Sequence, residues 1–171
     1  MKVGYAVLYE DGELVISKNY ILLQKKIIKD YGEFEDTNVP WKNKSSKIKK
    51  VKILDQVKSN CMKAWFENCM NLLTLIDFEN LDVSNCIDFS YMFYNCESLQ
   101  DLNGLQTWNV SNGIDFSYMF YNCYSLQKVL LSNTLDILTK EMFYNCNPNL
   151  KIQWKKHIYV YADLFEYEEL C

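Results

Sequence analysis

The feature that most constrains this chain is a seven-residue segment, SYMFYNC, that occurs twice without change. The two copies are residues 90–96 and 117–123, so they lie 27 residues apart. Looser copies flank them and end at Cys69 and Cys146. A fixed period of about 20–50 residues is typical of a repeat array, because a single unit cannot bury its apolar face alone and stacks on the next one. The sequence therefore predicts a modular chain of stacked repeats.

Two patterns divide each repeat. After the cysteine, leucines recur at spacings that suit short strands, as in Leu72 and Leu75, and such strands are expected to pair in parallel from repeat to repeat. Before the cysteine, apolar residues follow the i, i+3, i+4, i+7 spacing of one helical stripe. These residues are Phe89, Met92, Phe93 and Cys96, and then Phe116, Met119, Phe120 and Cys123. Each repeat is therefore predicted to contain a strand, a turn, a short helix and a second turn.

These repeats resemble the BspA-like leucine-rich-repeat proteins, whose units carry a pattern similar to LDVSN…DFSYMFYNCxSLxxL. Residues 81–102 and 108–129 carry it here, and the resemblance extends over roughly residues 50–154. It implies an α/β fold: a short leucine-rich-repeat-type solenoid, with a parallel sheet on one side and short helices on the other, capped at both ends. Known members include bacterial surface proteins that bind host proteins, so the resemblance also implies protein binding.

One domain with three parts is expected, since 171 residues and 49% hydrophobic content suit a single continuous core. The first part contains a predicted hairpin, residues 3–8 and 13–17, and a predicted amphipathic helix over residues 20–31 that ends at Gly32. The parts are an N-terminal hairpin-helix cap and linker (1–47), the solenoid (48–154) and a C-terminal cap (155–171).

The cysteines indicate packing rather than chemistry. Four of the seven, Cys69, Cys96, Cys123 and Cys146, share one repeat position, and free cysteine behaves as a small buried hydrophobe. No pair has the Cys-x2-Cys spacing of a metal site, so neither a metal nor a cofactor is expected. The odd number of thiols favours a reducing compartment.

Signals of an enzyme are missing from the sequence. His157 is the only histidine, and the chain contains no serine elbow and no phosphate-binding glycine loop. We therefore expect no enzymatic activity and no small-molecule substrate.

The sequence predicts a cytoplasmic location. The apolar run at residues 3–8 is shorter than the apolar region of a signal peptide, and Glu10 and Asp11 end it. No apolar stretch reaches the roughly 18 residues that span a membrane. A chain whose leader has been removed looks the same, so a cell-surface or secreted location is the alternative.

Charge is distributed unevenly along the chain. Residues 1–60 hold 12 lysines and 8 acidic residues, whereas residues 61–171 hold 6 and 14, which gives +4 and −8. The lysine-rich run at 42–52 suits phosphates or a solvated linker equally well. The chain has no arginine, the residue that most sequence-specific readers use, and its pI is near 5.1. These features disfavour nucleic acid as a ligand of the array, whose acidic character suits a basic groove of a partner.

Two surfaces are candidates for partner binding. Tyrosine is enriched at interfaces, although tyrosines here also suit packing between repeats with their hydroxyls in water. The tyrosines off the predicted buried stripe are Tyr91, Tyr94, Tyr118, Tyr121 and Tyr144. The polar residues predicted on the outer side of the sheet are Gln100, Asp101, Gln127 and Lys128.

The sequence thus predicts a non-enzymatic protein-binding module that contacts a protein partner, whose identity the sequence does not specify. One alternative is a small intracellular inhibitor of the mobile-element or phage type, which docks on a host enzyme or nuclease complex. Its basis is the charge asymmetry and the lack of a recognisable leader. The other is a fragment of a bacterial cell-surface adhesin, which rests on the family resemblance.

Overall fold

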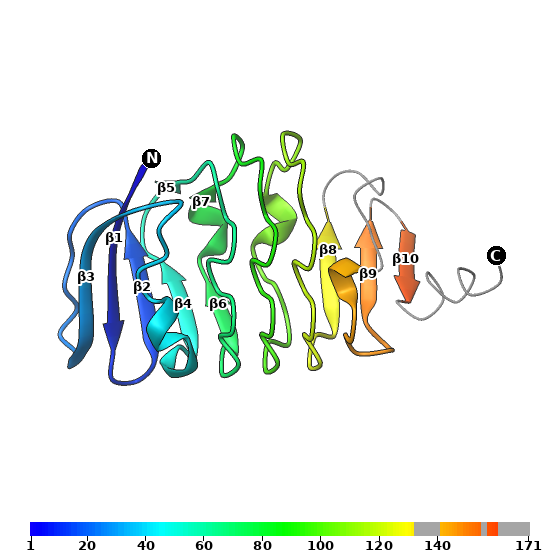
Figure 1. Cartoon of the computed structure of the whole chain (residues 1–171), viewed down its shortest axis with the longest axis horizontal. Helices are drawn as coiled ribbons and strands as arrows, with labels where there is room; N and C mark the ends of the chain where they lie inside the picture. The colour runs from blue at the N-terminus through cyan, green and yellow to red at the C-terminus, as the bar shows by residue number, and fades with distance from the viewer. Residues whose placement is uncertain (132–140, 155–156, 161–171) are drawn as a thin grey trace.

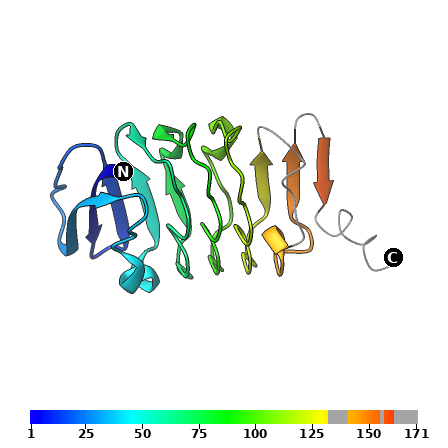
Figure 2. The ribbon, with the colours of Figure 1, turned by 45° about the horizontal axis from the view of Figure 1, so that its top comes forward.

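The computed structural model describes residues 1–131, 141–154 and 157–160. Strands lie side by side along the long axis of the molecule, from β3 at one end to β10 at the other (Figure 1; Figure 2 shows the same order from a second side). The described residues form three sheets, ordered β3-β1-β2-β4-β6, β10-β9-β8 and β5-β7. The strands are β1 (Lys2–Tyr9), β2 (Glu13–Ser17), β3 (Ile27–Glu35), β4 (Lys50–Ile53), β5 (Val57–Lys58), β6 (Thr74–Ile76), β7 (Leu81–Asp82), β8 (Lys128–Leu131), β9 (Lys151–Trp154) and β10 (His157–Val160).

The predicted N-terminal hairpin is confirmed. Strands β1 and β2 pair in antiparallel register, with Ala6 opposite Ile16, and the Asp11-Gly12 turn joins them. Beyond β2 the orientation changes, because β2, β4 and β6 pair in parallel. The hairpin therefore adds an antiparallel start to a parallel sheet.

The helix predicted over residues 20–31 is wrong. The later part of this segment belongs to strand β3, which pairs antiparallel with β1 and buries Phe34. The reason is that β1 is almost entirely buried, and a buried strand needs hydrogen-bond partners on both edges. That tertiary demand outweighs the local apolar spacing.

In the repeats, backbone N–H groups alternate between two kinds of partner. Odd-numbered residues donate to carbonyls of the next repeat: Phe89 to Asp115 at 2.8 Å, Tyr91 to Ser117 at 3.0 Å, Phe93 to Met119 at 2.9 Å, and Asn95 to Tyr121 at 2.8 Å. Even-numbered residues close turns by donating three residues back: Met92 to Phe89, Tyr94 to Tyr91, and Cys96 to Phe93. An α-helix would send all of these donors four residues back. The predicted helix is therefore replaced by a series of turns.

The left-handed backbone at two positions of each repeat explains why no helix forms. Tyr91 and Asn95 have φ values of 59° and 58°, and the equivalent Tyr118 and Asn122 have 59° and 60°. A left-handed residue interrupts a right-handed helix, and asparagine is among the few residue types that adopt this conformation readily. The predicted apolar stripe is nevertheless buried in both copies, so the turns present the same face that a helix would.

The predicted fold class, an α/β leucine-rich-repeat-type solenoid with a parallel sheet on one side and short helices on the other, is therefore wrong. The three sheets have mixed orientation, because β1, β2 and β3 pair antiparallel, as do β9 and β10. In the described residues the helical segments are short 3₁₀ turns: η1 (Lys42–Lys47), η2 (Phe78–Asn80), η3 (Leu105–Thr107) and η5 (Glu141–Phe143).

One contiguous core joins the hairpin to the repeats. Buried side chains extend from Val3 to Ile152. Its central feature is a column of phenylalanine rings with centroids 5.3–5.7 Å apart: Phe66, Phe93, Phe120 and Phe143. At the N-terminal end, the Trp41 ring continues the column 6.3 Å from Phe66, and its Nε1 donates to the carbonyl of Trp65 at 2.6 Å. This core holds the surface residues of successive repeats in register.

Candidate functional site

The five predicted tyrosines come together on one surface. Tyr91 stacks on Tyr118 with ring centroids 5.0 Å apart, and Tyr94 stacks on Tyr121 at 4.9 Å, which stacks on Tyr144 at 5.0 Å. Tyr91 also contacts Tyr94 at 5.5 Å, so the two rows touch. All are half-buried except Tyr144, which is 43% exposed. We call these five rings the tyrosine surface.

A ladder of asparagine side chains lies next to these tyrosines in sequence and links the same repeats. The Nδ2 group of Asn95 donates to Oδ1 of Asn68 at 2.8 Å, Asn122 donates to Asn95 at 2.7 Å, and Asn145 donates to Asn122 at 3.2 Å. This ladder was not predicted from the sequence, although an asparagine precedes the repeated cysteine in every copy. Together with the stacked rings, the ladder fixes the spacing of the surface.

The pKa of one tyrosine of this surface is raised. Burial, and then the neighbouring Tyr94 and Tyr144, raise the pKa of Tyr121 above its ordinary value. Its hydroxyl therefore stays protonated at neutral pH. The surface offers flat apolar rings together with hydroxyl groups, a combination that suits contact with another protein.

The predicted residues of the sheet side also come together, in two adjacent pairs. The backbone N–H of Gln127 donates to the carbonyl of Gln100 at 3.0 Å, and all four side chains are exposed. Lys128 begins β8, whereas Asp101 lies at the equivalent position one repeat earlier. These residues form a second, polar candidate surface.

The uneven charge of the sequence has a structural counterpart. Four lysines between residues 42 and 63 each pair with an acidic residue 24 or 25 positions later. The pairs are Lys42–Glu67 at 2.6 Å, Lys52–Asp77 at 3.8 Å, Lys58–Asp82 at 3.4 Å and Lys63–Asp88 at 3.4 Å. Part of the charge of the basic part is thus compensated by acidic residues about one repeat later.

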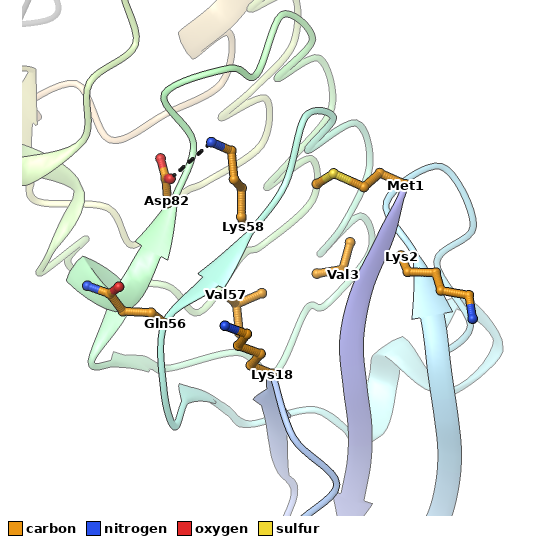
Figure 3. Close-up of a pocket in the computed structure, with 8 residues that line it drawn as sticks. All are labelled: Met1, Lys2, Val3, Lys18, Gln56, Val57, Lys58 and Asp82. Atoms are coloured by element: carbon orange, nitrogen blue, oxygen red, sulfur yellow. Dashed lines mark ion pairs between the residues drawn. The ribbon is translucent and has the colours of Figure 1, made fainter.

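A cavity of about 340 Å³ near the N-terminus shows the same compensation (Figure 3). Lys58 faces Asp82 across one side of it. Of the other cationic groups that line it, the Met1 amino group pairs with Asp36 at 2.7 Å, and Lys2 pairs with Glu33 at 2.8 Å. Among the four lining cations, only the Lys18 ammonium lacks such an ion pair with a described residue.

The repeated cysteines pack in the core, as predicted. Cys69, Cys96, Cys123 and Cys146 are buried, and the thiols of the last three contact carbonyls of the preceding repeat at 3.1–3.2 Å. Burial raises the pKa of Cys96 and Cys123 well above the ordinary value, and that of Cys146 to about 12. A reactive cysteine needs a low pKa and access to solvent, so these thiols are unsuited to nucleophilic chemistry.

Two further observations concern only the described part of the chain. Within residues 1–131, 141–154 and 157–160, no group of three or more His, Cys, Asp or Glu side chains is placed to hold a metal ion. The same residues contain no helix long and apolar enough to cross a membrane.

Comparison with known proteins identifies the family of this chain. No curated protein and no solved structure matches it. The model of one protein family matches residues 34–155, which include every residue of the tyrosine surface and of the polar surface. That family is described as "Mycoplasma protein of unknown function, DUF285", and the chain belongs to it.

Proposed function

We propose that the chain is a non-enzymatic protein-binding module and that the tyrosine surface is where the partner binds. The observation that carries the proposal is the arrangement of Tyr91, Tyr94, Tyr118, Tyr121 and Tyr144 as one contiguous, partly exposed set of rings. Tyrosine side chains offer a large contact area at a small entropy cost, and aromatic anchors dominate many interfaces.

Preorganisation supports this assignment. Each ring is held by its neighbours, and the asparagine ladder joins the same repeats at 2.7–3.2 Å. A surface that is already ordered gives up little conformational freedom when a partner binds. The rings can therefore serve two purposes, since they stack between repeats and remain partly exposed to a partner.

The resemblance of residues 81–102 and 108–129 to BspA-like repeats adds associational support, since members of that group bind proteins. The polar surface at Gln100, Asp101, Gln127 and Lys128 is the competing site. Polar side chains exposed on a sheet contribute less individually than aromatic anchors. The tyrosine surface is therefore the preferred assignment.

Affinity capture from the native cell, compared across matched variants, tests the proposal. The Tyr91→Ala, Tyr118→Ala double variant should lose the partner that the wild-type chain retains. The Tyr91→Phe, Tyr118→Phe variant keeps the rings and should retain most binding. The Gln100→Ala, Asp101→Ala variant is the control for the polar surface, and circular dichroism establishes that each variant is folded. If only the Gln100→Ala, Asp101→Ala variant loses the partner, the polar surface is the binding site and the tyrosines serve packing alone.

A further inference from the structure

A second cavity, of about 400 Å³, lies at the beginning of strands β8 and β9. Two lysines and three side-chain amides line it: Gln127, Lys128, Asn147, Asn149 and Lys151. No acidic residue lies among the described residues of this lining. The cavity is therefore positively charged within an otherwise acidic half of the chain.

The positions of the two lysines disfavour the cavity without a bound anion. Lys128 and Lys151 are direct register partners on the parallel strands β8 and β9, and both are exposed. Like charges directly opposite each other on neighbouring strands are destabilising. Neither lysine forms an ion pair with any described residue.

Another pair of parallel strands carries opposite charges at directly paired positions. Lys58 and Asp82 are register partners on the parallel strands β5 and β7, and their side chains form an ion pair at 3.4 Å. At the β8–β9 position the acidic partner is replaced by a second lysine. The register partner of Lys128 on β9 therefore adds a positive charge instead of compensating one.

The turn that leads into β9 supplies amide groups. The segment Asn147-Pro148-Asn149 stands where the preceding repeat begins its turn with Tyr124-Ser125. The N–H of Asn149 donates to Oδ1 of Asn147 at 2.9 Å, and the N–H of Lys151 donates to the carbonyl of Gln127 at 3.0 Å. These bonds fix the turn beside the two lysines, and the first of them also holds the side chain of Asn147 through its Oδ1.

We propose that this cavity binds a phosphate group, either free or as a phosphate monoester. The two ammonium groups match the charge of such an anion, and the amide N–H groups of the three lining side chains can donate to its oxygens. A carboxylate carries a single charge and fits this arrangement less well. The site is formed by different residues from the tyrosine surface and does not depend on the function proposed for that surface.

Titration of the full chain, followed by NMR of the side-chain amides, tests the site. The probes are inorganic phosphate, O-phosphoserine and acetate, each at ionic strength matched with sodium chloride. Saturable shifts at Gln127, Asn147 and Asn149 are expected with the two phosphate probes, and weaker binding with acetate. Tighter binding of O-phosphoserine indicates a phosphorylated side chain as the natural ligand, whereas tighter binding of inorganic phosphate indicates the free anion.

Charge-neutral variants complete the test. Lys128→Gln and Lys151→Gln should each weaken phosphate binding roughly tenfold, as expected for loss of one charge-assisted contact. Lys26→Gln changes net charge equally at the opposite end of the molecule and should leave binding unchanged. Either lysine variant suffices if the other does not fold. The proposal is overturned if no shift saturates, if both variants bind like the wild type, or if acetate binds as tightly as phosphate.

Discussion

The N-terminal hairpin and the central repeats satisfy the same backbone groups in different ways. In the hairpin, β1 exchanges antiparallel hydrogen bonds with β2 and β3 along its length. In the repeats, alternate N–H groups cross to the next repeat and the others close turns. This pattern can be extended from repeat to repeat, because each unit offers the same carbonyls to the N–H groups of the unit before it. The hairpin forms the N-terminal end of the array.

Strand β3 closes the N-terminal end of the array. It is the edge of its sheet, and its pairing with β1 shifts register opposite Gly32, whose φ is +64°. Lys29, Asp30 and Glu33 place charges along the strand. Bulges and charges on an edge strand discourage pairing with a further strand. The two regions thus differ in purpose, since one promotes stacking and the other stops it.

Thiol reactivity should show the largest difference between the boundary and the repeats. Cys61, near the start of the array, is half-buried, whereas Cys96 and Cys123 are fully buried. Labelling of the buried pair requires local opening, so it should be slower than labelling of Cys61 by on the order of a hundredfold or more. Mass spectrometry after timed labelling of the native protein measures both rates. Equal rates, or a native disulfide between Cys96 and Cys123, would contradict the packed ladder.

Removing a ring from the central column should have the largest effect on stability. The Phe93 ring has a neighbour on each side, Phe66 at 5.5 Å and Phe120 at 5.7 Å. Phe93→Ala should lower the free energy of unfolding by about 3–5 kcal/mol, as large-to-small core changes do. Urea unfolding measures it, with Phe93→Leu as a control that retains most of the volume. A loss below about 1 kcal/mol would show that the column of rings contributes little to the stability of the repeats.

These two predictions depend on a stripe of buried residues that the sequence revealed correctly. The period of 27 residues and the spacing of Phe89, Met92, Phe93 and Cys96 were sufficient to identify the inward face. They were not sufficient to identify the secondary structure, because turns with a left-handed residue at every fourth position bury the same residues as a helix. Asparagine before each cysteine was the available signal, since it favours that conformation.

Other parts of the structure lay beyond sequence reasoning for different reasons. The strand at residues 27–35 forms because β1 needs a second partner, which is a tertiary requirement and leaves no local pattern. The inter-repeat ion pairs became visible only when the stacking register was known. The tyrosines were identified from the repeat alone, since equivalent positions in a stacked array must be neighbours.

A smaller effect is expected from the asparagine ladder. Asn95→Ala removes two side-chain hydrogen bonds, to Asn68 and Asn122, and also disfavours the left-handed backbone. It should destabilise the chain by about 1–3 kcal/mol. Asn95→Gly keeps the backbone conformation and loses only the ladder, so it should cost less. The same urea experiment compares them, and equal losses would show that the backbone preference is unimportant.

The smallest effect is expected where the two regions meet, at the ion pair between Lys42 and Glu67. Its Nζ–Oε2 distance is 2.6 Å, but the lysine side chain is 62% exposed, so water screens the attraction. Exposed pairs contribute about 0.2–1 kcal/mol in double-mutant cycles. Lys42→Met, Glu67→Gln and the double variant form such a cycle, and the coupling energy should decrease as sodium chloride is added. A coupling energy well above 1 kcal/mol that is insensitive to salt would mean that charge, rather than the shared core of Trp41 and Phe66, holds the hairpin region to the repeats.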